Sequence, residues 1–345
     1  MIKQGSASSS ASLEIFVTDF PFGELNEEKQ MLEQSKISGK IRASWCDTPE
    51  EVMAKAADAD ALLVHHTPIN AEVIKKLDNL KVIGRYGAGY DVIDVQAATA
   101  AGIPVINDPT YCVEEVSAHA LALILTLNRR LFSLHKLVRE NKWRGPEDFN
   151  SGGTIHRLRG QKLGIIGLGR IGQRLAEKAR ALGLEILIWD RRAEEKLAEN
   201  PELQQVETAD FSEVFSRADI ISVHLPLTAE TSGLIGEKEF ELMHKDSIFI
   251  NTARGDIVRE QTLVQALKAE KIAGAGLDVF KTEPLPDNHS LLNLPAEIEE
   301  RVIMTPHAAF YSQEAKTELR DSIMHQVLSI LTGEKPPHIV NPGVW

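Results

Sequence analysis

The feature that most constrains this chain is a glycine-rich turn between two apolar runs. Residues 163–166 lead directly into Gly167-Leu-Gly169-Arg-Ile-Gly172, and a second apolar run ends at Asp190. Apolar residues recur at helical spacing between them, which predicts strand, turn, helix and strand. Such a unit binds the pyrophosphate of a dinucleotide at the helix N-terminus. An ordinary strand-to-helix turn is the alternative, but the complete flanking context favours the dinucleotide.

The three glycines and the terminal acid have separate expected roles. The first glycine allows the tight turn, the second lets the backbone approach a pyrophosphate, and the third permits close helix packing. Asp190 lies 18 residues beyond Gly172, near the roughly 20 expected for the acid that binds the adenosine ribose. Arg191 and Arg192 follow it and could favour a 2′-phosphate, or they are a solvated basic pair. Because a carboxylate repels that phosphate, we predict NAD rather than NADP.

Composition excludes several classes of protein. The 345 residues suffice for two domains. The net charge of −12 argues against a basic surface that would bind nucleic acid or an anionic membrane. No apolar run approaches the ~20 residues of a membrane span. Cys46 and Cys112 have neither metal nor redox spacing, so we expect no metal site and a reducing, cytoplasmic location. Residues 1–12, rich in Ser and Ala, are expected to be a disordered leader.

Strand and helix patterns alternate over residues 13–106 and again from 162 onward. This alternation predicts an α/β fold with parallel sheets covered by helices on both faces. Between the two regions, residues 113–140 show one continuous helical pattern, which predicts a single long helix. Residues 141–159 are polar and contain Trp143. A loop of this length is usually functional or part of an interface, although an ordinary surface loop is the alternative.

Residues that follow the predicted strands are candidates for chemistry, because ligands bind beyond the carboxyl ends of parallel strands. Arg254, Glu283 and His307 all have this position. Arg can bind a substrate carboxylate in bidentate geometry, and His can supply a proton to a developing alkoxide. A neighbouring carboxylate would orient the His and favour its charged form. Taken singly, Arg254 could be a surface ion-pair residue, Glu283 a solvated loop acid and His307 a core histidine. Their shared position at the ends of strands of one sheet favours a catalytic role.

Four segments resemble the D-isomer-specific 2-hydroxyacid dehydrogenases. They are residues 85–91, 167–172, 251–255 with 277–284, and 305–309. The resemblance covers nearly the whole chain after the leader. It implies two Rossmann-like or flavodoxin-like parallel-sheet domains, with the NAD-binding domain inserted into a discontinuous substrate domain. The expected boundaries are 13–113 plus 307–345 for the substrate domain and 114–306 for the NAD-binding domain.

The resemblance also implies a role for each matching residue. His307 would be the general acid, Glu283 would support its protonated form, and Arg254 would bind the substrate carboxylate and carbonyl. The implied substrate-binding residues are Arg85, Ala88 and Gly89. The implied cofactor-binding residues are Gly167, Gly169, Arg170, Ile171, Gly172, Asp190, His224, Pro226, Thr252, Ala253 and Asp278.

Within the family, residues 306–312 are similar to the C-terminal-binding-protein branch, which has Trp where this chain has Phe310. Phosphoglycerate dehydrogenases are also similar, and several carry a regulatory domain that we do not expect here. The resemblance implies an NAD-dependent D-2-hydroxyacid dehydrogenase, or 2-keto acid reductase, and leaves the substrate side chain open. An NADH-sensing scaffold or corepressor is the alternative function. A homodimer is implied, with the 113–140 helix and the Trp143 loop as the candidate interface.

Overall fold

The computed structural model describes residues 12–150, 153–203 and 205–345. They form two compact units: unit 1 is residues 12–112 with Ser312–Trp345, and unit 2 is the described part of Val113–Tyr311. Each unit contains one parallel sheet, so the predicted fold class is confirmed. The predicted leader lies outside the described residues, apart from Ser12. Within the described part of the chain, no helix has the length and apolar character needed to cross a membrane.

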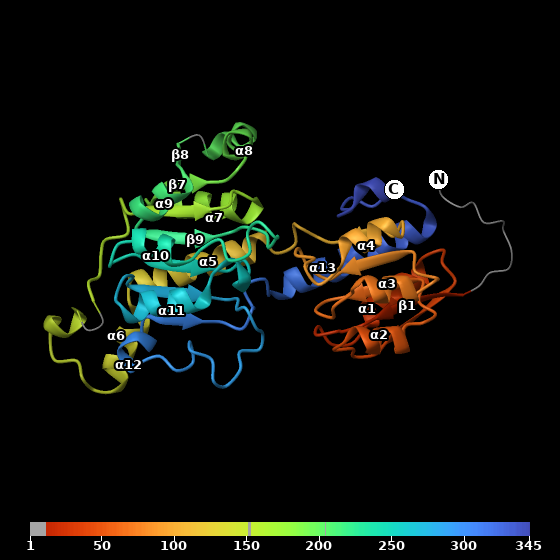
Figure 1. Ribbon diagram of the computed structural model, residues 1–345, viewed down its shortest axis with the longest axis horizontal. Helices are drawn as coiled ribbons and strands as arrows, with labels where there is room; N and C mark the ends of the chain where they lie inside the picture. Colours follow the sequence, from red (N-terminus) through yellow and green to blue (C-terminus); the bar gives the residue numbers. More distant parts are fainter. Residues whose placement is uncertain (1–11, 151–152, 204) are drawn as a thin grey trace. The chain divides into compact units, whose positions relative to one another are not determined.

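Unit 1 is built on five parallel strands in the order β2-β1-β3-β4-β5, the flavodoxin-like order of a doubly wound sheet. The strands are β1 (Leu13–Val17), β2 (Gly39–Ala43), β3 (Ala61–Val64), β4 (Val82–Arg85) and β5 (Val105–Ile106). The helices are α1 (Asn26–Gln34), α2 (Pro49–Lys55), α3 (Ala71–Lys76), α4 (Val95–Ala100) and α13 (Gln313–Thr332). Helices cover both faces of this sheet (Figure 1).

The core of unit 1 follows from the alternation of side chains along each strand. Ile15 and Val17 of β1 pack in one apolar cluster with residues of α1 and α13. Phe16, between them, packs in the opposite cluster with residues of α2, α3 and α4. Both faces of the central strands are therefore buried, which explains why β3 is apolar without interruption.

Unit 2 contains seven parallel strands in the order β12-β11-β10-β9-β6-β7-β8, the Rossmann order with one added strand. The strands are β6 (Lys162–Ile166), β7 (Glu185–Trp189), β8 (Glu207–Thr208), β9 (Ile220–Val223), β10 (Ile248–Asn251), β11 (Gly274–Leu277) and β12 (Val302–Met304). The helices are α5 (Val113–Asn128), α6 (Leu131–Arg139), α7 (Arg170–Ala181), α8 (Ala193–Glu199), α9 (Phe211–Arg217), α10 (Glu237–Leu242), α11 (Glu260–Lys268) and α12 (Ala296–Glu299).

The topological switch point of unit 2 lies at β6, which pairs with β7 on one side and β9 on the other. Helices α5 and α7 contribute to the apolar cluster on one face of the sheet. Helices α9, α10 and α11 contribute to the cluster on the other face (Figure 1). Because the strands are parallel, the turns that follow β6, β7, β9, β10, β11 and β12 all lie along one carboxyl edge, where ligands bind in such sheets.

The prediction of one helix over residues 113–140 is wrong. The chain forms α5 and α6, separated at Arg129 and Arg130. Arg130 adopts a left-handed conformation with φ of 49°, and its Nε donates a hydrogen bond to Thr154 O at 3.4 Å. No glycine or proline marks this break, and α6 continues the apolar pattern. The sequence pattern therefore gave no sign of it.

Along the chain, unit 2 begins at Val113 and unit 1 resumes at Ser312, five residues after the expected boundary at His307. The reason is local hydrogen bonding. The backbone N–H groups of His307 and Ala308 donate to Asp278 at 2.8 and 2.9 Å. The 307–311 segment is therefore attached to the β11 end of unit 2.

Candidate active site

The glycine turn after β6 has the geometry of a phosphate-binding turn. Gly167 has φ of +102°, a conformation that favours glycine. A Cβ atom at Gly172 would lie 2.3 Å from Gly167 O, so α7 can pack this closely only without a side chain. A Cβ atom at Gly169 would meet nothing within 4 Å. Helix α7 begins at the next residue, so its first N–H groups, which have no intrahelical partner, adjoin this open position, as in a phosphate-binding turn.

Asp190 ends β7 and is held by three donors. Its Oδ2 accepts from Leu168 N at 2.8 Å and from Lys196 Nζ at 2.6 Å, and its Oδ1 accepts from Arg192 N at 2.8 Å. Burial raises the pKa of Asp190, but these interactions outweigh it and hold the pKa below its ordinary value. The sequence pattern does not predict the contact between Asp190 and Lys196, which lies in α8. Arg191 is paired with Glu230 at the surface.

The turn after β10 holds Thr252 and Ala253. The buried side chain of Asn251 fixes this turn from both sides, because its Nδ2 donates to Arg254 O at 2.9 Å and its Oδ1 accepts from Ala253 N at 3.0 Å. Among the described residues, no partner lies within hydrogen-bond distance of the buried Thr252 Oγ1. A buried hydroxyl without a partner is costly, so a hydroxyl-bearing ligand such as a ribose fits here. The sequence reasoning missed Asn251.

His224 and Pro226 follow β9 at the same edge. His224 Nε2 lies 2.8 Å from Ser222 Oγ, and Pro226 O accepts from Thr231 Oγ1 at 2.7 Å. Burial lowers the pKa of His224 to about 4, so this ring stays neutral near neutral pH. A neutral ring adds no positive charge to the carboxyl edge of the sheet.

The same pKa makes stability depend on pH. Between about pH 6.5 and about pH 4 the unfolded chain binds a proton at His224 that the folded chain does not, so acidification favours unfolding. We expect this group to remove about 2 kcal/mol of unfolding free energy between pH 7.5 and 5. Urea denaturation of the apoprotein at both pH values should show that His224→Gln has lost this part of the pH dependence. An identical pH dependence in the variant would contradict the assignment.

Glu283 and His307 form a hydrogen-bonded pair in the segments that follow the neighbouring strands β11 and β12. Glu283 Oε2 lies 2.7 Å from His307 Nδ1, and the two side chains are 32% and 30% exposed. Glu283 Oε1 accepts from Phe280 N at 2.8 Å. Burial raises the pKa of Glu283, but the hydrogen bond and charge of His307, with smaller effects of Phe280 N and Arg254, leave the pKa below its ordinary value. The carboxylate therefore stays ionised beside the imidazole.

Arg254 follows β10, and its turn packs against the loop that carries Glu283. A Cβ atom at Gly255 would lie 2.0 Å from Phe280 C, so only glycine permits this approach. Arg254 Nη1 donates to Ala253 O at 2.7 Å. Lys281 N, beside Phe280, donates to Glu260 Oε1 at 2.7 Å. The turn and the loop are thus fixed against each other, and they place Arg254 within electrostatic reach of Glu283.

Asp278 ends β11 and organises the turn that carries His307. Its Oδ1 accepts from Thr305 Oγ1 at 2.5 Å and from Ala308 N at 2.9 Å, and its Oδ2 accepts from Ala309 N at 2.9 Å. His307 has φ of 52°, a left-handed conformation that costs a non-glycine residue about 1–2 kcal/mol. The hydrogen bonds of Asp278 offset this cost. The sequence reasoning assigned Asp278 only to the cofactor.

The predicted substrate-binding residues lie together in a loop of unit 1. Arg85 ends β4 and is buried, and its guanidinium donates to Tyr86 O. Ala88 and Gly89 follow and are half-buried. Asn107 Nδ2 donates to Ala88 O at 2.7 Å, which fixes the loop. Every predicted catalytic and cofactor-binding residue belongs instead to unit 2.

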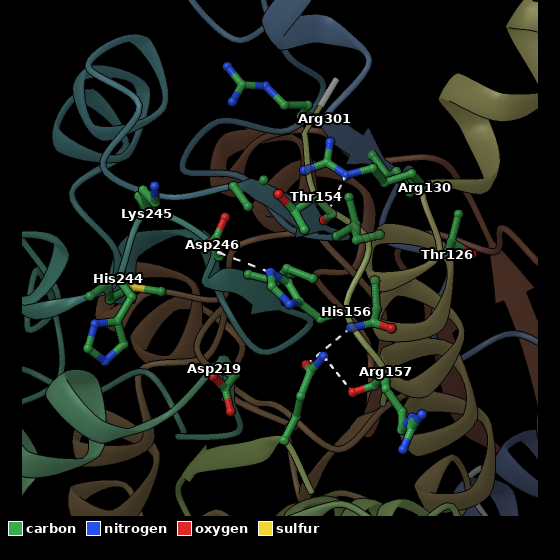
Figure 2. A pocket seen from close by; sticks show the side chains of 18 of the residues that line it. Thr126, Arg130, Thr154, His156, Arg157, Asp219, His244, Lys245, Asp246 and Arg301 are labelled. Atoms are coloured by element: carbon green, nitrogen blue, oxygen red, sulfur yellow. Dashed lines mark hydrogen bonds and ion pairs between the residues drawn. The ribbon is translucent and has the colours of Figure 1, made fainter. Parts of the chain in front are cut away.

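A cavity of about 870 Å³ lies elsewhere in unit 2, at the amino edge of the sheet. Asp219 and Arg301, which directly precede β9 and β12, contribute to its lining. Figure 2 shows Arg130 and Arg301 on one side of this cavity and His156 facing Asp246, with His156 Nε2 3.9 Å from Asp246 Oδ2. The cavity is therefore separate from the carboxyl edge. In the described ranges, no cluster of His, Cys, Asp and Glu is placed to hold a metal ion.

Comparison with known proteins agrees with this geometry. A family model described as D-isomer specific 2-hydroxyacid dehydrogenase, NAD binding domain, matches residues 121–309. The chain is 37% identical over 303 residues to a glyoxylate reductase of Thermofilum pendens, covering 87% of this chain and 86% of that protein. It is 36% identical over 293 residues to a hydroxypyruvate reductase of Blautia hydrogenotrophica, covering 85% and 88%. The D-lactate dehydrogenase of Aquifex aeolicus, solved with NAD and lactic acid, is similar with a TM-score of 0.82, 27% identity, and coverage of 95% and 99%.

The sheet order, the glycine turn and the family match define an NAD-dependent oxidoreductase. Within that class, the chain belongs to the D-isomer specific 2-hydroxyacid dehydrogenase family. The predicted family, enzyme class and cofactor are thereby confirmed. The finer resemblance to the C-terminal-binding-protein branch stays a prediction.

Proposed function

We propose that the protein reduces small 2-keto acids to D-2-hydroxy acids with NADH. The observation that carries this proposal is the 2.7 Å pair of Glu283 and His307, placed on the same sheet edge as the dinucleotide turn. NADH, when bound, supplies a hydride to C2 of the substrate. The chain must then supply a proton to the carbonyl oxygen and bind the substrate carboxylate.

His307 is the proton donor in this proposal. Its Nδ1 faces Glu283, so Nε2 is the nitrogen that delivers the proton as the carbonyl oxygen gains charge. The ionised Glu283 stabilises the imidazolium and orients the ring. In the reverse direction, neutral His307 accepts the hydroxyl proton at Nε2.

Arg254 has the complementary role of binding the substrate carboxylate and polarising the carbonyl. Its planar guanidinium can donate two parallel hydrogen bonds to a carboxylate. We assign substrate binding also to Arg85 and to the backbone N–H groups of Ala88 and Gly89. The fixed loop conformation of these three residues supports the assignment, because preformed donors bind without reorganisation.

The cofactor-binding set follows the geometry of the carboxyl edge. The buried Thr252 Oγ1 has no hydrogen-bond partner among the described residues, and the absence of a side chain at Gly169 leaves open space beside the turn. The N-terminus of α7 has N–H groups that can donate to a phosphate. On this basis we assign pyrophosphate binding to Gly167, Gly169, Arg170, Ile171 and Gly172, adenosine binding to Asp190, His224 and Pro226, and nicotinamide-riboside binding to Thr252, Ala253 and Asp278.

We expect NADH to be preferred over NADPH. Asp190 carries a negative charge at the ribose position, and Arg191 and Arg192 have acidic neighbours in Glu230 and Glu195. Asp190→Asn keeps an acceptor oxygen and removes the charge. It should raise the NADPH/NADH ratio of kcat/KM by about 10- to 100-fold, because hydrogen bonds to charged groups contribute about 1.5–3 kcal/mol. An unchanged ratio, or a wild-type protein that prefers NADPH, would contradict the assignment.

We also propose a homodimer that forms through α6 and the segment after it. Leu131, Phe132 and Val138 of α6 are 52%, 55% and 62% exposed, and Trp143 is 56% exposed. Such a concentration of exposed apolar side chains is typical of an interface. Phe132 also lines the cavity of Figure 2, whose arginines can donate hydrogen bonds to acidic groups of a second copy.

The dimer has a direct test. Light scattering should give twice the mass of one chain for the wild type and the single-chain mass for Phe132→Asp with Val138→Asp. Leu242→Asp, at an exposed apolar position of α10, is the matched control and should remain dimeric. A wild-type mass of one chain at all concentrations would refute the proposal.

The proposed activity is tested by NADH oxidation with a panel of keto acids. Glyoxylate, hydroxypyruvate, pyruvate, phenylpyruvate and phosphohydroxypyruvate differ in the size and charge of the side chain. Turnover of at least one of them supports the proposal and ranks the side chains. If none is reduced while NADH binds tightly, the reductase proposal fails and the NADH-sensing alternative gains support.

A further inference from the structure

We propose that Thr305 and His119 are positioning residues for His307 and act on it through the carboxylate of Asp278. This inference rests on the proposed role of His307 as the proton donor. It concerns a chain of hydrogen bonds that runs from α5 to the turn after β12.

Asp278 binds the backbone at His307 and at the two residues that follow it. His307 N donates to Asp278 O at 2.8 Å and to Thr305 O at 3.0 Å. The next two N–H groups, those of Ala308 and Ala309, donate to the two oxygens of the Asp278 carboxylate at 2.9 Å each. Asp278 is only 1% exposed, so water has little access to replace these bonds. The orientation of this carboxylate therefore fixes the left-handed conformation of His307.

Thr305 fixes the orientation of the carboxylate in turn. Its hydroxyl lies 2.5 Å from Asp278 Oδ1. A carboxylate has no proton to donate, so the single hydroxyl proton of Thr305 is used in this bond. The lone pairs of Thr305 Oγ1 remain, and His119 Nε2 lies 2.9 Å away.

The proton count then determines the state of His119. Because Thr305 Oγ1 can only accept from His119, Nε2 of His119 must carry a proton. His119 belongs to α5, a helix that packs against β10 and β11. Hydrogen bonds thus connect α5, through His119, Thr305 and Asp278, to the turn that places His307 beside Glu283.

Loss of the Thr305 hydroxyl should therefore affect the chemical step more than binding. Without it, the Asp278 carboxylate gains freedom to rotate, and the His307 ring shifts relative to the substrate carbonyl. A shift of about 1 Å at a reacting group lowers the rate by up to roughly 100-fold. The glycine turn, Asp190 and Thr252 are untouched by this change. Asp278 is itself assigned to nicotinamide-riboside binding, so the NADH dissociation constant should rise, but by a smaller factor than the fall in kcat.

Steady-state kinetics of Thr305→Val and Thr305→Ser provide the first test. Valine has the shape of threonine without the hydroxyl, and we expect kcat to fall by roughly 10- to 100-fold, with smaller changes in KM and in the NADH dissociation constant. Serine restores the hydroxyl and should restore most of kcat. Thr262→Val removes a hydroxyl in the first turn of α11 that donates to Arg259 O and should leave kcat unchanged. A wild-type kcat in Thr305→Val would overturn the inference.

A second test does not depend on turnover. Long-range ¹H–¹⁵N spectra of the imidazole rings, with His119→Gln for assignment, should show a protonated Nε2 in His119 of the wild type. That signal should shift in Thr305→Val. An unprotonated Nε2 would overturn the inference. If no keto acid is reduced by the wild type, the proposed function fails separately, and the tautomer of His119 still decides whether the hydrogen-bond chain exists.

Discussion

Replacement of His307 by asparagine is expected to lower kcat for keto acid reduction by about 10²- to 10⁴-fold, the usual contribution of a general acid. Asparagine cannot deliver a proton to the carbonyl oxygen, and it loses the charge that Glu283 stabilises. The NADH dissociation constant should stay nearly unchanged, because the glycine turn, Asp190 and Thr252 are untouched. Stopped-flow hydride transfer and fluorescence titration of NADH would measure the two quantities separately.

The control for this variant is His325→Asn, at an exposed position of α13 in unit 1. It makes the same chemical change away from the proposed active site and should retain the wild-type rate. If His307→Asn also retained that rate, the assignment of the proton donor would be wrong. A loss of NADH binding in His307→Asn would indicate instead that the turn after β12 had rearranged.

Arg254→Lys is expected to lower kcat/KM by about 10²- to 10³-fold, the typical cost of removing one electrostatic contact to a transition state. Lysine keeps the positive charge but cannot form two parallel hydrogen bonds with a carboxylate. The variant should therefore show a raised KM for the keto acid as well as a lower kcat. Kinetics over a range of keto acid concentrations would separate these effects.

Arg259→Lys provides the matched control for Arg254. Arg259 is exposed, lies five residues further along the chain and donates from Nε to Gly233 O at 3.0 Å. Its replacement should leave both kinetic constants near wild type. Equal activity of Arg254→Lys and Arg259→Lys would exclude Arg254 from substrate binding.

The dinucleotide unit could be predicted from sequence because local rules determine each part of it. A glycine with positive φ, a close helix contact and an acid after the second strand all follow from residue type and short spacing. Glu283 and His307 are a different case, because 24 residues separate them. Their meeting depends on β11 and β12 being neighbours. The positions of strand ends in the sequence indicate only that the two residues share one edge of the sheet. Contact between Glu283 and His307 can be predicted only when the order of the strands is known.

The hydrogen bonds that hold the turn at His307 could not be predicted from the sequence, for a physical reason. His307 occupies a left-handed conformation that residue type does not favour, so tertiary hydrogen bonds from Asp278 must stabilise it. Lys196 beside Asp190 is a similar case, since a basic residue in a helix is usually solvated. The break at Arg130 also lacked a local signal. These features depend on tertiary partners that a pattern along the chain does not identify.

The measurement that tests the central claim most directly follows deuterium from NADH into the product. The protein would be incubated with NADH deuterated at both C4 positions and the best keto acid of the panel. Chiral chromatography with mass spectrometry would then analyse the 2-hydroxy acid. We predict the D-enantiomer with one deuterium at C2, formed in equal amount to the oxidised cofactor. An L-product, or a product without deuterium at C2, would contradict the account.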